Sequence, residues 1–86
     1  MGIPDTQMMY QHASQVRRIS EEMNRLNNMY LLGAADNIAS AWQGDAATEF
    51  LRHCATTRDQ VRNTVSALLE VANDMERTAR KWDSIT

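Results

Sequence analysis

The stretch NIASAWQGDAATEF, residues 37–50, decides how this chain folds because it separates two long helical patterns. It holds Gly44, one of only three glycines in the chain, two positions after Trp42. Glycine takes the left-handed backbone conformation that ends a helix at little cost, whereas a residue with a Cβ loses roughly 1 kcal/mol or more there. Asp45 can then cap the next helix, because its carboxylate accepts from free amide groups and favours the positive end of the helix dipole. We therefore predict a turn at residues 42–45.

The pattern before this turn predicts one helix over about residues 6–41. Asp5 or Thr6 can cap its start, directly after the only proline of the chain, and no later proline interrupts it. Steps of three and four residues keep side chains on one stripe of a helix. The residues at these steps, strongly apolar in the middle of the row, are Met9, His12, Val16, Ile19, Met23, Leu26, Tyr30, Gly33 and Asn37.

After the turn the same spacing restarts and predicts a second helix over about residues 46–83. Only Arg58 breaks its apolar character. The row consists of Ala47, Leu51, Cys54, Arg58, Val61, Val65, Leu68, Ala72, Met75, Ala79 and Trp82. A period of 3.5 residues is typical of coiled-coil-like packing, so we predict an all-α fold in which residues 1–86 form one antiparallel two-helix hairpin. Each helix of about 35 residues would be roughly 50 Å long.

The chain also carries more apolar residues than a hairpin can bury, because each helix of a hairpin buries only one stripe. Large apolar residues outside the two rows are Met8, Met29, Leu31, Leu32, Ile38, Phe50, Leu69 and Val71. We therefore predict that the hairpin pairs into a four-helix bundle as a dimer, unless these residues are merely scattered on the surface. The residues predicted to form the seam, the row along which helices touch in the hairpin or dimer, are Val16, Ile19, Met23, Leu26, Tyr30, Leu51, Val61, Val65, Leu68, Met75 and Trp82.

Composition and charge argue against several classes of partner. The formal net charge is −2 with acidic and basic residues interspersed, which does not favour a nucleic-acid partner. No apolar run approaches the ~20 residues that cross a bilayer, and the first residues lack the basic and apolar regions of a secretory signal peptide. We expect no stable membrane insertion.

Catalytic chemistry is not indicated by the sequence. His53 and Cys54 are adjacent in a predicted helix, so their side chains point about 100° apart and do not form a nucleophile and base pair. A single cysteine forms no disulfide within the chain, and the spacings typical of metal ligands do not occur. We predict a protein that is not an enzyme and binds no metal or cofactor.

A turn needs no indole, so Trp42 either covers the open end of the hairpin or presents a surface to a partner. Two amphipathic helices in fewer than 100 residues, with Trp42 and Gly44 as a Trp-x-Gly pair at the turn, resemble the WXG family of ESAT-like small secreted proteins. The resemblance implies helical hairpins that pair into antiparallel four-helix bundles, as homodimers or heterodimers with a similar hairpin. It also implies export from the bacterial cytoplasm by type VII secretion without a cleaved signal peptide.

The chain departs from that family in one respect. The family carries a C-terminal signal, an aromatic residue followed four positions later by an acidic one, which lies beside the Trp-x-Gly turn of the partner. No aromatic residue here meets that pattern; the pairs four positions apart are Tyr10 and Ser14, Tyr30 and Ala34, Phe50 and Cys54, and Trp82 and Thr86.

Several interpretations are compatible with the sequence. The protein is a secreted partner whose signal comes from another chain, or an accessory that docks on the helical N-terminal region of a larger type VII effector, with the secretion ATPase as a further candidate partner. It could equally be a homodimer with a degenerate signal, or a cytoplasmic adaptor hairpin unrelated to secretion. In the adaptor, Trp42 would only close the end of the hairpin.

Overall fold

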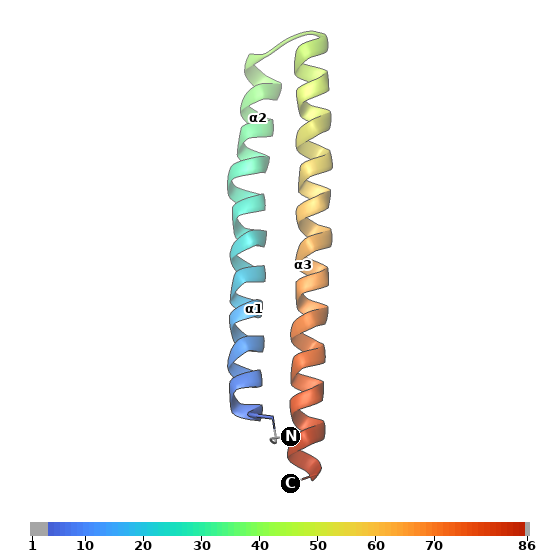
Figure 1. Cartoon of the computed structure of the whole chain (residues 1–86). Coiled ribbons are helices and arrows are strands. Elements are labelled where there is room, and N and C mark those ends of the chain that lie inside the picture. Colours follow the sequence, from blue (N-terminus) through green and yellow to red (C-terminus); the bar gives the residue numbers. More distant parts are fainter. Residues whose placement is uncertain (1–3, 86) are drawn as a thin grey trace.

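Two long helical arms lie antiparallel and side by side in the computed structural model, which describes residues 4–85 (Figure 1). The first arm consists of α1 (Thr6–Leu26), η1 (Asn27–Leu31) and α2 (Leu32–Ala41). The second arm is the single helix α3 (Asp45–Ile85). The molecule is a rod with extents of 64 × 17 × 16 Å. The predicted all-α hairpin is confirmed, and no strand occurs among the described residues.

The first arm begins at a side-chain cap. The Asp5 Oδ1 accepts from the backbone N–H of Met8 at 3.0 Å, and the Asp5 carbonyl accepts from the N–H of Met9 at 3.1 Å. A carboxylate in this position satisfies amide groups that have no partner within the first helical turn.

The first arm is not one uninterrupted α-helix, although the sequence pattern predicts one. Residues 27–31 form a π-helical segment, in which the N–H of Leu32 donates to the carbonyl of Asn27, five residues earlier. Such a segment inserts one residue into the helical repeat, so every side chain after it is rotated around the helix axis relative to the pattern before it. The arm keeps its contact with α3 past this point through half-buried residues, namely Leu31, Ala35 and Ile38.

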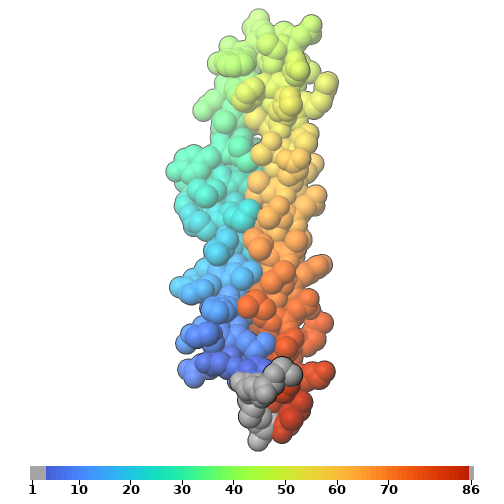
Figure 2. Space-filling model, in the orientation of Figure 1, coloured from blue at the N-terminus to red at the C-terminus, as the bar shows by residue number. Residues whose placement is uncertain are grey.

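Small residues hold the arms together. The side chains buried between them are Ala13, Ser20, Asn27, Ala47, Cys54, Ala72 and Ala79. Small side chains let the arms approach closely, and Figure 2 shows the arms in contact along the rod. None of these buried residues is a large apolar one, and the large apolar side chains are half-buried or exposed.

The contact row on α1 is displaced by one residue from the predicted stripe. Positions 13, 20 and 27 are buried, where the spacing points to positions 12, 19 and 26. Ile19, Leu26 and Tyr30 are 54%, 40% and 63% exposed, so much of each of these side chains lies outside the contact between the arms. The physical reason is steric, because a branched or aromatic side chain facing α3 would hold the arms apart where alanines bring them together.

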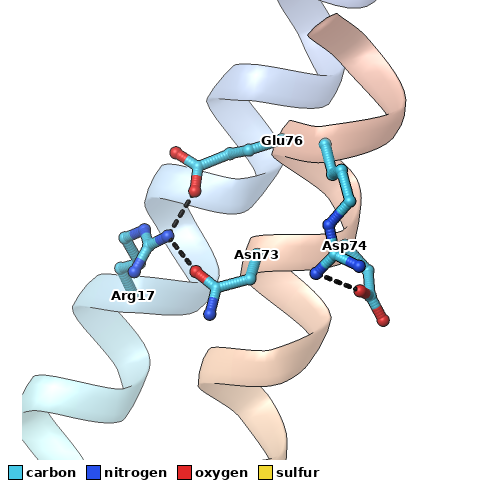
Figure 3. A network of polar contacts seen from close by, with 5 residues as sticks. Arg17, Asn73, Asp74 and Glu76 are labelled. Atoms are coloured by element: carbon cyan, nitrogen blue, oxygen red, sulfur yellow. Dashed lines mark hydrogen bonds and ion pairs between the residues drawn. The ribbon is translucent and has the colours of Figure 1, made fainter. Parts of the chain in front are cut away.

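Polar side chains connect the arms along one edge of the rod. Arg17 of α1 donates to Asn73 Oδ1 at 2.6 Å and pairs with the carboxylate of Glu76, both on α3 (Figure 3). Nearer the chain ends, the Tyr10 hydroxyl donates to Asp83 Oδ2 at 3.4 Å. Loss of hydration and the neighbouring Asp83 carboxylate both raise the pKa of Tyr10 above its usual value. We call this row the polar edge.

Candidate functional site

The turn between the arms depends on a single backbone conformation. Gly44 has φ +87°, and no other described residue has a positive φ. A Cβ on Gly44 would meet no atom within 4 Å, so glycine is needed here for its conformation and not for space.

Gly44 caps the start of α3 and does not close the end of α2. α2 ends at Ala41, and the N–H of Trp42 makes its closing hydrogen bond to the Ile38 carbonyl at 2.9 Å. The Gly44 carbonyl accepts from the N–H of Thr48 at 3.2 Å and from its hydroxyl at 3.3 Å. Gly44 therefore occupies the N-cap of α3, whereas the sequence suggested that it would terminate the first arm.

Asp45 consequently lies one position further along than predicted. It is the first residue of α3 and sits in the first turn, so it is not the residue that caps the helix. Its carboxylate still lies at the positive end of the helix dipole, where a negative charge is favourable.

Trp42 packs against α3 at the turn end of the hairpin. Its ring lies 5.8 Å from that of Phe50 on α3, centroid to centroid, with the two planes tilted by 51°. Tilted aromatic pairs at this separation are favourable. Trp42 nevertheless stays 51% exposed and Phe50 43% exposed. The two rings form a partly exposed aromatic surface at the end of the hairpin, which we call the end patch.

A match to a family model over most of the chain decides the family. A family model described as WXG100, proteins of 100 residues with WXG, matches residues 5–84. The chain belongs to the WXG100 family. Trp42, Gln43 and Gly44 supply the Trp-x-Gly of that name. Comparisons with curated proteins and with solved structures gave no match.

Family membership defines the general role of the chain. WXG100 proteins are small, non-enzymatic helical hairpins that pair with one another and are secreted by the type VII route. Within residues 4–85, no helix of this WXG100 protein is long and apolar enough to span a bilayer.

A second surface of this WXG100 protein is apolar and lies on α1 and η1. It is the row Ile19, Met23, Leu26 and Tyr30, which we call the α1 stripe. Residues two positions apart on a helix point about 200° apart, so Ile19 faces away from the polar edge on which Arg17 meets Glu76. The apolar and polar edges of the rod are thus separate surfaces.

The α1 stripe borders a hollow of about 330 Å³. The residues lining the hollow are Met23, Leu26, Asn27, Tyr30, Leu31 and Val61. All of these side chains except that of Asn27 are apolar or aromatic, and they come from both arms. Side chains of the segment around residue 30 project from one side of the rod (Figure 2).

The one polar residue of the hollow, Asn27, is only 2% exposed. Its Nδ2 donates to the backbone carbonyl of Arg58 at 3.3 Å, while its Oδ1 and the Nε of Arg58 are buried without a hydrogen-bond partner. The single charged residue that breaks the apolar row of α3 therefore meets the one amide side chain buried in the described part of the first arm. Buried polar groups of this kind reduce stability but can set the register of packed helices.

The remaining predicted seam residues lie as follows. On α3 the side chains between the turn and residue 75 are half-buried and face the first arm: Leu51, Val61, Val65, Leu68 and Met75. Val16 and Met23 of α1 are also half-buried, and Trp82 is 37% exposed. The structure thus brings the α3 residues to the hairpin contact and leaves most of the bulky α1 residues on the surface.

Sequence reasoning did not predict the contact of Trp42 with Phe50 or the hydrogen bond of Tyr10 with Asp83. The only signal for the first is that Trp42 and Phe50 are eight residues apart across the turn. The contact row of the first arm does have a sequence signal, because its small and polar residues Ala13, Ser20 and Asn27 repeat every seven residues.

The histidines and the cysteine form no site among the described residues. His12 and His53 are exposed, Cys54 is a buried free thiol, and the described residues hold no cluster of three or more potential metal ligands.

Proposed function

We propose that this WXG100 protein is a substrate or co-secreted partner of a bacterial type VII secretion system and acts by pairing its hairpin with a second, similar hairpin in a four-helix bundle. The observation that supports this most is the apolar surface left uncovered. Eleven large hydrophobic side chains are 37–66% exposed: Met8, Ile19, Leu26, Met29, Tyr30, Leu32, Trp42, Phe50, Val71, Trp82 and Ile85.

The total surface area supports the same proposal. The chain exposes 6442 Å². A compact protein of 9.8 kDa would expose about 5,200 Å². The difference of about 1,200 Å² exceeds the roughly 800 Å² that each partner loses in a protein interface of standard size. A second hairpin lying along the rod would remove surface of this amount.

We further propose that the end patch of Trp42 and Phe50 is the recognition element for export. Trp42 and Phe50 are 51% and 43% exposed, and aromatic side chains are common anchors in interfaces. We also propose that another chain supplies the export signal. That chain would be a different hairpin, or the helical N-terminal region of a larger type VII effector to which this protein is an accessory; the secretion ATPase would then recognise the assembly.

The test replaces Trp42 by alanine in bacteria that export the protein. We expect less protein in the culture medium while the purified variant keeps its helical circular dichroism, because the indole packs on Phe50 at the end of the rod and not between the arms. Gln43→Ala is the matched control, since it changes the neighbouring exposed residue of the same turn and should leave export unchanged.

Two results would contradict the proposal. If Trp42→Ala unfolds the hairpin, Trp42 is needed for the stability of the fold and is not a recognition element. If the unchanged protein never leaves the cell, the cytoplasmic adaptor is the correct interpretation.

A further inference from the structure

We infer that η1 is a positioning element for Trp42. The one extra residue that this segment holds brings the tryptophan of the turn onto the side of the first arm that faces α3, where its ring packs on Phe50. This role rests on the proposed function of the end patch in export, and it names the distant segment that sets the orientation of the patch.

The residues of α1 that face α3 follow a regular spacing up to the start of η1. They are buried or half-buried and lie alternately three and four positions apart: Ala13, Val16, Ser20, Met23 and Asn27. Two helices that touch along a coiled-coil-like seam keep this spacing for as long as both remain regular α-helices.

The same spacing fails in the second half of the arm. Continued beyond position 27, it selects residues that are all exposed: Tyr30, Ala34, Asn37 and Ala41. Half-buried residues occur instead one position later in each of the first three places: Leu31, Ala35 and Ile38. The contact row therefore moves by one residue within η1 (Asn27–Leu31).

The hydrogen bonding of η1 accounts for the extra residue. The N–H of Leu32 donates to the carbonyl of Asn27, five residues earlier, whereas an α-helix uses the fourth residue. Asn27 is 2% exposed, and its Nδ2 donates to the carbonyl of Arg58 at 3.3 Å. The arm is thus fixed to α3 at the position where the extra residue begins to be accommodated.

The exchange of side chains at the seam favours the shifted row. It brings the aliphatic side chains of Leu31 and Ile38 towards α3 and leaves Tyr30 and Asn37 exposed. Burying aliphatic groups is favourable, whereas burying a phenol hydroxyl or an amide requires a hydrogen-bond partner for it. This difference offsets the poorer hydrogen bonding of a π-helical segment.

The shifted row leads directly to the tryptophan of the turn. Trp42 lies four positions after Ile38, and its N–H donates to the Ile38 carbonyl in the closing bond of α2, so the helix still places its backbone. Without the extra residue, Ala41 would occupy the row. Trp42 would then lie about 100° around the helix axis, away from Phe50.

Two variants of the full chain test the positioning. Deletion of Asn28, an exposed residue inside η1, removes the extra residue and leaves Leu31, Ile38 and Trp42 on one row of an uninterrupted α-helix. The shifted variant combines this deletion with an alanine inserted between Ala39 and Ser40. It has the length of the natural chain, but its tryptophan is one position off the row.

Nuclear Overhauser contacts between the indole of Trp42 and the ring of Phe50 report the placement directly. We expect these contacts in the natural chain and in the deletion variant, and their loss in the shifted variant, while all three remain helical by circular dichroism. Contacts that persist in the shifted variant would show that the turn alone places Trp42 and would overturn the inference. Their loss in the deletion variant would also overturn it, so the test holds even if the shifted variant does not fold.

Export from bacteria that secrete the protein separates this inference from the proposed function. We expect the deletion variant to be exported like the natural chain, and the shifted variant to fall to the level of Trp42→Ala. A shifted variant that loses the ring contact and is still exported would support the positioning role of η1 and overturn the recognition role of the end patch.

Discussion

At the scale of single residues, Gly44 and Trp42 have separate tasks within three positions of the chain. Gly44 provides the positive φ and the carbonyl that begins α3. Trp42 ends α2 in an extended conformation and places its indole on Phe50, where about half of it stays open. The backbone reversal therefore needs the glycine, and the tryptophan side chain is available for recognition.

Gly44→Ala should lower the free energy of unfolding by about 1 kcal/mol or more, because alanine is strained at φ +87°. Gly33→Ala is the control, since Gly33 lies inside α2 without a positive φ, and a Cβ added there would meet no atom within 4 Å. That substitution should raise stability by up to about 1 kcal/mol, since glycine is a poor helix former. Urea titration followed by circular dichroism measures both, and equal effects of the same sign would contradict the assignment.

At the scale of the elements, the residues fully buried between the arms are small, and the large apolar residues are half-buried or exposed. Ala72 and Ala79 of α3 are fully buried, while Ile19 and Leu26 of α1 are substantially exposed. Periodicity in steps of three and four predicts a seam row on each arm, and on α1 this row consists of the larger residues. Those steps describe a helix with an apolar face and do not say whether its own second arm or another molecule covers that face.

Ala72→Leu should destabilise the hairpin by about 1–3 kcal/mol, because the larger side chain would have to be accommodated where the arms are in close contact. Val71→Leu provides the comparison at the neighbouring position, which is 48% exposed, and should change stability by less than about 0.5 kcal/mol. Thermal unfolding of both variants at one protein concentration gives the difference. A tolerated Ala72→Leu would show that the arms are further apart than the buried alanines indicate.

At the scale of the whole molecule, the thin rod is the feature that connects fold and function. A rod of 64 × 17 × 16 Å has little interior, so an isolated hairpin buries few large side chains. Under the proposed pairing, a second helical molecule would cover much of its exposed apolar surface. The polar edge, where Arg17 bonds to Asn73 and Glu76, lies on a different side of the rod from the α1 stripe.

The melting temperature should therefore rise with protein concentration, because a partner that binds only the folded chain stabilises it by mass action. Calorimetry over about a hundredfold range of concentration measures this effect. A melting temperature independent of concentration, in a sample that sedimentation shows to be monomeric, would mean that the hairpin is stable alone and that pairing requires a different chain.

The sequence by itself determined the two helical arms, the turn at Trp42 and Gly44, and the family, because these depend on local backbone preferences and on spacing along one chain. Only the tertiary structure decided that Ala13, Ser20 and Asn27 face α3, that residues 27–31 form a π-helical segment, and that Phe50 supports Trp42. These features depend on how closely the two helices approach each other. The side chains of both arms together determine that distance, and the periodicity of one arm alone does not predict it.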